Sequence, residues 1–218
     1  MPEKAPIFEK VYQDYVAAVG SLDLPSLAPM LGATMNGDEL EVKLFDQIFA
    51  VSGAGVRGPD GERPNHSTSV VLAKYLLTCP DREPVDAEWV TYKDFKDALP
   101  YAEGFENTVH KPLVEFFSGR LAGLRESCEQ LSAVPLDMEV NADLAVRCEG
   151  LPKIPLALVF YDEDEDFPAG CSVLFQRSAA SYLDMECIAI LGALFRVRLI
   201  EKAQTGPAPE SEKFLHAF

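Results

Sequence analysis

Basic residues are scarce in this chain. Its 218 residues include 19 lysines and arginines against 35 aspartates and glutamates, which gives a formal net charge of −16 at pH 7. Such a charge repels the phosphate backbone of nucleic acids and the anionic surface of a membrane. The composition therefore argues against binding to nucleic acid and against attachment to a membrane.

Long apolar runs are also missing. No stretch approaches the roughly 20 apolar residues that cross a bilayer, and residues 1–15 have neither the basic start nor the apolar core of a secretory signal. We therefore expect a cytoplasmic protein. Hydrophobic residues make up 48% of the chain, which is enough to form a buried core in one large domain or two small ones.

The five cysteines include no pair at Cys-x-x-Cys spacing and lie far apart: Cys79, Cys128, Cys148, Cys171 and Cys187. A structural zinc site or an iron–sulfur cluster usually takes at least two ligands from one tight loop. We therefore expect reduced, buried thiols that act as small hydrophobic side chains, and neither a metal site nor an intrinsic cofactor.

Histidine is rare as well, with only three residues. His66 lies at an expected helix start, His110 within an expected helix, and His216 near the C-terminus. Neither His66 nor His110 stands near a cysteine or serine at a spacing typical of a nucleophile and its base, and there is no nucleophile elbow. The sequence therefore identifies no catalytic residue, and a binding protein is favoured over an enzyme.

The apolar periodicity predicts a mixture of helices and strands. Helical spacing occurs over residues 7–20, 70–78, 105–133 with a break at 118–119, and 183–199. Strand-like alternation predicts a hairpin from 40–44 and 48–51 with its tip at 45–47, followed later by strands in 144–148, 156–161 and 172–175. We expect a single α+β domain over residues 1–202, with an antiparallel or mixed sheet covered by several helices, and a C-terminal tail over residues 203–218.

A glycine-rich stretch, Gly53–Gly58, matches the dinucleotide-binding pattern G-x-G-x-x-G letter for letter. The pattern binds a pyrophosphate only where the glycines open directly into a helix. Here residues 59–65 form a second turn-forming stretch instead. We therefore expect a flexible loop rather than a dinucleotide site.

Five consecutive acids occupy residues 162–166 between two expected strands. Asp162, Asp164 and Asp166 match the first, third and fifth positions of a calcium-binding loop. The match then fails, because Phe167 replaces the glycine at the sixth position and Val173 replaces the glutamate at the twelfth. A solvated turn is the favoured interpretation, and a weak site for a hard cation or a docking surface for a basic partner remain open.

The start of the last helix offers further candidates. Asp184 could cap this helix, because acids in a first turn face the positive end of the helix dipole. The functional alternative is a pocket lined by Tyr182 and Glu186 and closed by the acidic turn. The candidate residues for binding a ligand or partner are Asp164, Glu165, Asp166, Tyr182 and Glu186.

The order of several short motifs resembles an uncharacterised bacterial and archaeal family, the domain of unknown function 3786. The main motifs are Lys153-Ile154-Pro155-Leu156, Asp164-Glu165-Asp166-Phe167-Pro168, Leu174-Phe175 with Ser178-Ala179, Tyr182-Leu183 with Glu186, and Leu191-Gly192. Trp89-Val90 with Phe95, and Pro112-Leu113, are similar to an earlier part of the family. The resemblance extends over residues 39–199.

The resemblance implies a protein of anaerobic metabolism, because such domains occur mainly in anaerobic bacteria and archaea. In some of these proteins the domain is joined to a four-cysteine iron–sulfur domain like that of corrinoid proteins. The resemblance suggests a non-catalytic module that binds, as a separate chain, an iron–sulfur or corrinoid protein of one-carbon or redox metabolism. An enzyme or small-ligand receptor with a pocket between residues 162–166 and the helix near Tyr182 is the alternative. Gln176 and Cys187 stand where the family commonly has acids, which argues against a shared carboxylate site.

Overall fold

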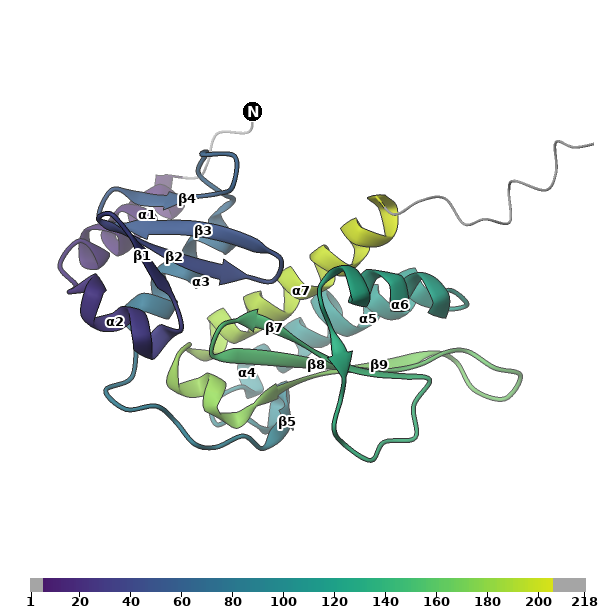
Figure 1. Cartoon of the computed structure of the whole chain (residues 1–218). Coiled ribbons are helices and arrows are strands. Elements are labelled where there is room, and N and C mark those ends of the chain that lie inside the picture. The colour runs from purple at the N-terminus through teal and green to yellow at the C-terminus, as the bar shows by residue number, and fades with distance from the viewer. Residues whose placement is uncertain (1–5, 206–218) are drawn as a thin grey trace, which may run out of the picture.

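The computed structural model describes residues 6–205 and contains two antiparallel sheets with helices packed around them (Figure 1). The predicted α+β class is confirmed. The strands expected in one sheet are divided between two, and neither sheet is mixed. The final helix extends to Thr205, so residues 203–205 are helical rather than part of a tail, and residues 206–218 lie outside the described residues.

The first half of the fold, residues 6–77, forms a four-stranded sheet and three helices. The helices are α1 (Pro6–Val19), α2 (Leu24–Leu31) and α3 (His66–Leu77), and the strands are β1 (Thr34–Asn36), β2 (Glu39–Leu44), β3 (Gln47–Ser52) and β4 (Gly55–Arg57). Each strand pairs with its neighbour in the sequence, in the order β1-β2-β3-β4. The hairpin expected over residues 40–51 is therefore present, with its turn at Phe45 and Asp46.

The glycine-rich stretch is not the flexible loop that the sequence suggested. Residues 53–54 form a tight turn, and Gly55–Arg57 pair with β3 as strand β4. Gly55 has a φ of +127°, and a Cβ atom there would lie 2.6 Å from the hydroxyl of Tyr12, which accepts a hydrogen bond from the Val56 N–H. The glycines thus allow a close approach of α1 to the sheet rather than a phosphate site.

Helix α3 begins earlier than the apolar pattern predicted. Asn65 caps it, because the Asn65 side chain accepts a hydrogen bond of 2.9 Å from the Thr68 N–H. The helix starts at His66, eight residues after Gly58, which also excludes the direct opening into a helix that a dinucleotide site requires.

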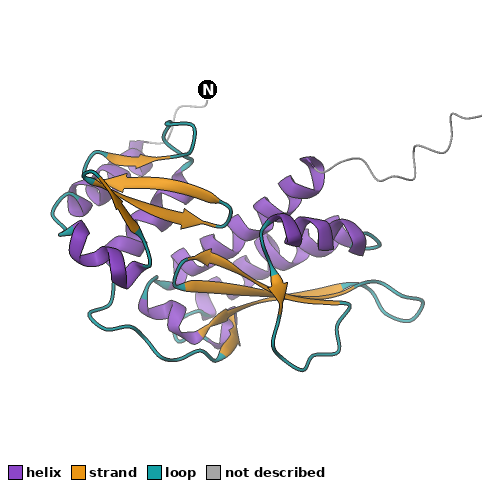
Figure 2. Cartoon of the chain, viewed as in Figure 1, coloured by secondary structure: helices purple, strands orange, loops and turns teal. Residues whose placement is uncertain are grey.

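The second half forms a five-stranded antiparallel sheet in the order β5-β9-β8-β7-β6. Its strands are β5 (Trp89–Thr91), β6 (Val134–Pro135), β7 (Leu144–Leu151), β8 (Ile154–Tyr161) and β9 (Gly170–Gln176). Its helices are α4 (Leu99–Phe105), the π-helical turn η2 (Glu106–His110), α5 (Lys111–Phe117), α6 (Leu121–Gln130) and α7 (Met185–Thr205), with short 3-10 turns η1 (Tyr92–Asp94) and η3 (Arg177–Ser181). The helices gather on one side of this sheet (Figure 2).

Helix α7 lies at the centre of the molecule. Its buried stripe, Ile188, Leu191, Phe195 and Leu199, follows helical spacing, and the helix packs against α3 of the first half and α4, α5 and α6 of the second. A Cβ atom on Gly192 would lie 2.5 Å from the Phe105 ring, so glycine permits this close packing. Within residues 6–205, no helix combines the length and the apolar character that crossing a membrane requires.

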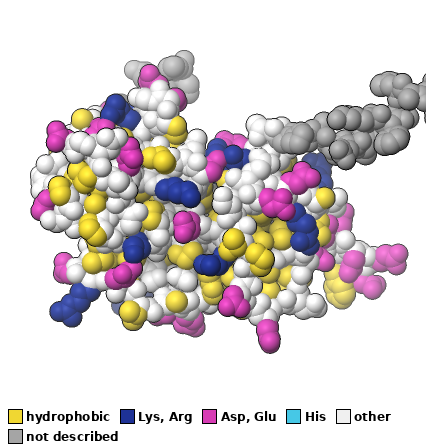
Figure 3. Space-filling model, in the orientation of Figure 1, with side chains coloured by type: hydrophobic (Ala, Val, Ile, Leu, Met, Phe, Trp, Pro, Cys, Tyr) yellow, Lys and Arg dark blue, Asp and Glu magenta, His cyan; other side chains and the backbone are white. Residues whose placement is uncertain are grey.

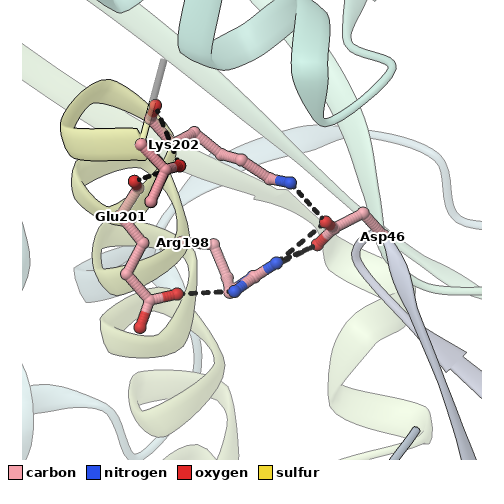
Figure 4. A network of polar contacts seen from close by, with 5 residues as sticks. Asp46, Arg198, Glu201 and Lys202 are labelled. Carbon is pink, nitrogen blue, oxygen red and sulfur yellow. Dashed lines mark hydrogen bonds and ion pairs between the residues drawn. The ribbon is translucent and has the colours of Figure 1, made fainter. Parts of the chain in front are cut away.

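The tip of the β2–β3 hairpin joins the two halves. Phe45 is buried, its N–H donates to the Gly150 carbonyl at 2.8 Å, and its ring stacks on Phe195 with 5.8 Å between centroids. Next to it, the Asp46 carboxylate accepts hydrogen bonds of 2.7 and 2.8 Å from Arg198 and lies 2.7 Å from Lys202 (Figure 4). The hairpin is thus held to α7 by an aromatic contact and by an ion-pair network.

The Asp46 network is only about a fifth exposed at each of its main side chains. Burial by itself would raise the pKa of Asp46, but hydrogen bonds from Lys202 and Arg198 outweigh burial and lower this pKa below the ordinary aspartate value. Asp46 therefore stabilises the folded state wherever it is ionised.

We expect Asp46→Asn to lower the free energy of unfolding by about 1–3 kcal/mol at pH 7, because Lys202 loses its ion pair with Asp46 and Arg198 retains only its ion pair with Glu201. Urea unfolding measures this loss. Asp46 contributes above the ordinary aspartate pKa of about 3.9, and its contribution disappears as the pH falls through the lowered folded-state pKa. The difference between the two proteins should therefore shrink below about pH 4.

The matched control is Asp38→Asn, at the exposed turn between β1 and β2, where the carboxylate forms no ion pair with other described residues. It should change stability little. An equal loss in both variants would show that the Asp46 network does not hold the hairpin to α7.

Candidate functional site

The acidic turn, residues 162–166, connects β8 to β9 and projects beyond the sheet at the right of Figure 1. Asp164, Glu165 and Asp166 are exposed. One oxygen of Asp164 accepts hydrogen bonds from the N–H groups of Asp166 and Phe167 at 2.8 and 2.7 Å, and the Asp164 N–H donates to the Phe167 carbonyl at 3.0 Å. The turn is therefore ordered by its own backbone.

The base of the turn is bonded to neighbouring loops. The Asp162 side chain accepts a hydrogen bond of 2.7 Å from the Gly119 N–H, in the connection between α5 and α6, and the Asp162 N–H donates to Asp143 at 2.8 Å. Phe167, directly after the five acids, is 70% exposed. Across the described part of the chain, no group of three or more His, Cys, Asp or Glu residues is arranged to hold a metal ion.

Tyr182 lies at the opposite end of β9 from the acidic turn. The turn precedes Gly170, the first residue of β9, whereas Tyr182 follows the short η3 turn after Gln176. Seven strand residues span about 20 Å. The pocket that we expected between the acidic turn and the helix near Tyr182 is therefore not formed, because the full length of a strand separates its two walls.

Glu186 forms no hydrogen bond or ion pair with the acidic turn or with Tyr182. It is exposed in the first turn of α7 and forms no hydrogen bond or ion pair with other described residues. Its charge acts on Tyr92, whose pKa is raised to about 12 mainly by burial and to a smaller degree by nearby groups including Glu186. Asp184 caps the helix as expected, because it accepts a hydrogen bond of 2.9 Å from the Cys187 N–H.

Tyr182 instead lines a polar pocket of about 280 Å³ beside the β7–β8 turn. Besides Tyr182, the charged and polar residues in its wall come from four separate segments of the chain: Glu83, Arg147 with Glu149, Lys153, and Gln176 with Ser178. Sequence reasoning missed this group. The alternation of β7 places residues 147 and 149 on one face and was a usable signal, but the contribution of Glu83 depends on long-range folding.

The Tyr182 side chain is only 1% exposed, and its hydroxyl is buried without a hydrogen-bond partner among the described residues. Burial, with smaller effects of Glu83 and Cys79, raises the pKa of this hydroxyl. The neighbouring Tyr75 differs, because its hydroxyl donates to the Leu31 carbonyl at 2.8 Å and accepts from the Lys153 N–H at 3.2 Å. The two tyrosine rings lie 5.8 Å apart.

His110 ends the π-helical turn η2 and has a structural role. Its Nδ1 lies 2.6 Å from a carboxylate oxygen of Glu106, and its Nε2 accepts a hydrogen bond of 3.1 Å from the Val173 N–H. Because Nε2 is an acceptor, the ring proton lies on Nδ1 and is donated to Glu106. Both ring nitrogens are therefore engaged in holding η2 against β9.

The five cysteines are free thiols, of which Cys128, Cys148 and Cys187 are buried. Burial raises the pKa values of Cys128, Cys148 and Cys171 to about 12. It also raises that of Cys187, the residue at which an acid was expected from the family resemblance. These thiols are therefore protonated at neutral pH and are poor nucleophiles.

A family model described as a domain of unknown function, DUF3786, matches residues 23–197, about four fifths of the chain. The chain belongs to the DUF3786 family. The predicted family is thus confirmed, and the match includes the acidic turn, Tyr182 and Glu186. No curated protein and no solved structure matches the chain.

We expect Cys128, Cys148 and Cys171 to resist alkylation in the folded protein. Burial raises the pKa of each thiol to about 12, so the reactive thiolate is scarcer at pH 8 in the folded protein than in the unfolded chain. Iodoacetamide should therefore modify these residues much faster in urea than in the folded protein, as followed by peptide mass mapping. Comparable rates in the two states would show that these thiols are reactive in the folded protein.

Proposed function

We propose that this DUF3786 protein is a non-catalytic, cytoplasmic binding module for an iron–sulfur or corrinoid protein of anaerobic metabolism. The family resemblance supports this class of partner, because similar domains are sometimes joined to a four-cysteine iron–sulfur domain. A DUF3786 protein that is not joined to such a domain would bind the same kind of partner by docking onto its surface. The net charge of −16 favours a partner with a basic surface.

The observation that supports a docking role best is the ordered acidic turn with Phe167 beside it. Phe167 is 70% exposed and adjoins exposed carboxylates. Aromatic side chains are frequent anchors of protein interfaces, and surrounding charges steer a partner of opposite sign. Acidic side chains also gather at the end of the molecule where the turn projects (Figure 3).

The internal bonding of the turn adds to this argument. A loop that is already held in one conformation loses less entropy when it binds than a loop that must become ordered. Asp164 holds the tip and Asp162 holds the base, while Glu165, Asp166 and Phe167 remain exposed. The exposed acids and the Phe167 ring can therefore contact a partner with little loss of conformational entropy.

A non-catalytic role is supported by the state of the reactive side chains. Burial keeps Cys128, Cys148 and Cys171 protonated, so they are weak nucleophiles. Both ring nitrogens of His110 are engaged in structural hydrogen bonds. These groups are therefore used for packing and for backbone support.

Affinity capture under anaerobic conditions tests the proposal. Immobilised protein should enrich a specific iron–sulfur or corrinoid protein from an extract of the host, identified by mass spectrometry and by the iron, cobalt and absorption spectrum of the captured fraction. The combined variant Asp164→Asn, Glu165→Gln and Asp166→Asn should reduce capture at least about tenfold, and Phe167→Ala by a similar factor.

The matched control removes three exposed acids elsewhere by Glu103→Gln, Glu115→Gln and Glu129→Gln, which lie on α4, α5 and α6. It changes the net charge by the same amount and should preserve capture. Failure to enrich any iron–sulfur or corrinoid protein would contradict the proposed partner. Equal loss in both triple variants would show that net charge alone, and not the acidic turn, attracts it.

A further inference from the structure

We propose that the pocket beside Tyr182 binds a small zwitterion of the α-amino-acid class. The pocket lies at the other end of β9 from the acidic turn, so the inference goes beyond the partner-docking proposal and does not depend on it. Its volume of about 280 Å³ is close to the lower limit of ordinary ligand pockets, about 300 Å³, and suits a small molecule.

The floor of the pocket follows from the register of the five-stranded sheet. Glu149 of β7 pairs with Pro155 of β8, and Arg147 pairs with the fully buried Ala157. Because Leu156 pairs with Phe175, Gln176 of β9 lies next to Pro155 on the other side. The short side chain of Pro155 therefore lies between the long polar side chains of Glu149 and Gln176, and all three line the pocket.

The charges in the pocket wall indicate which class of ligand the pocket suits. Lys153 and Glu83 form an ion pair of 2.5 Å and neutralise each other. Arg147 and Glu149 form no ion pair with any described residue, although both line the pocket. Residues two apart on one strand lie about 7 Å apart on the same face. The pocket thus presents one unpaired cation and one unpaired anion at a separation that a small zwitterion can bridge.

In this arrangement the ligand carboxylate pairs with the Arg147 guanidinium, which suits bidentate hydrogen bonding, and the ligand ammonium pairs with Glu149. A purely anionic ligand would face Glu149, and a purely cationic one would face Arg147. The charge pattern therefore discriminates against both.

The Tyr182 hydroxyl gives an independent reason to expect a ligand. Its side chain lines the pocket and is 1% exposed, yet the hydroxyl has no hydrogen-bond partner among the described residues. Buried polar groups are almost always paired in folded proteins, so an orphaned one in a pocket wall indicates a missing partner. A polar group of the bound ligand supplies that partner.

Calorimetry and thermal unfolding with the twenty common amino acids test the proposal, with succinate and putrescine as probes of one charge sign. We expect at least one amino acid to bind saturably and to raise the unfolding temperature, and neither single-sign probe to do so. Arg147→Gln and Glu149→Gln should each weaken binding at least about tenfold, whereas Lys96→Gln and Glu115→Gln, at exposed positions elsewhere, should not.

Tyr182→Phe separates binding from folding. It should weaken binding about fivefold, as loss of one hydrogen bond predicts, while the unliganded variant unfolds at the same temperature as the original protein or a higher one. Binding should also persist in the triple variant of the acidic turn, which keeps this test distinct from the docking proposal. The inference is overturned if no amino acid binds, if succinate or putrescine binds as tightly, or if Arg147→Gln and Glu149→Gln leave affinity unchanged.

Discussion

The burial of α7 is the constraint on which the rest of the structure depends. Its apolar stripe packs against α3 from the first half of the chain and against α4, α5 and α6 from the second. Each fully buried leucine, isoleucine or phenylalanine contributes about 1.5–3 kcal/mol relative to an exposed one. Because one helix supplies this apolar surface to both halves, neither half retains a complete core without it, and the hairpin tip at Phe45 and Asp46 extends the same junction.

Ion pairs between separate elements involve several of the few basic residues in this chain, and this explains where its charges lie. Several of its lysines and arginines contact acids that join separate elements, as Arg63 does with Glu9, Lys74 with Asp184, and Lys153 with Glu83. Two more cations meet at Asp46. Cations used in this way leave a surplus of carboxylates on the surface, of which the acidic turn is the densest run in the sequence. The excess of acidic over basic residues therefore accounts both for the acidic surface and for the use of cations in ion pairs between elements.

Strand β9 sets the relation between the two proposed sites. The acidic turn precedes it and Tyr182 follows it, so the length of this strand separates them. A protein partner on the turn and a small ligand in the pocket would then occupy the molecule without direct overlap. The helices gather on one side of this sheet (Figure 2), and in β7 the exposed Arg147 and Glu149 of the pocket wall alternate with the buried Cys148.

Local pattern alone determined the β2–β3 hairpin, the strands near 144, 156 and 172, the Asp184 cap and the family, because each depends on neighbouring residues whose periodicity or capping chemistry is visible in sequence. Only the tertiary structure decided that the strands form two sheets, that Gly55–Arg57 form β4, and that Tyr182 lines a pocket with Arg147 and Glu149 rather than with the acidic turn. Pairing between distant strands depends on how buried side chains fit around α7, and no local period in the sequence records that fit.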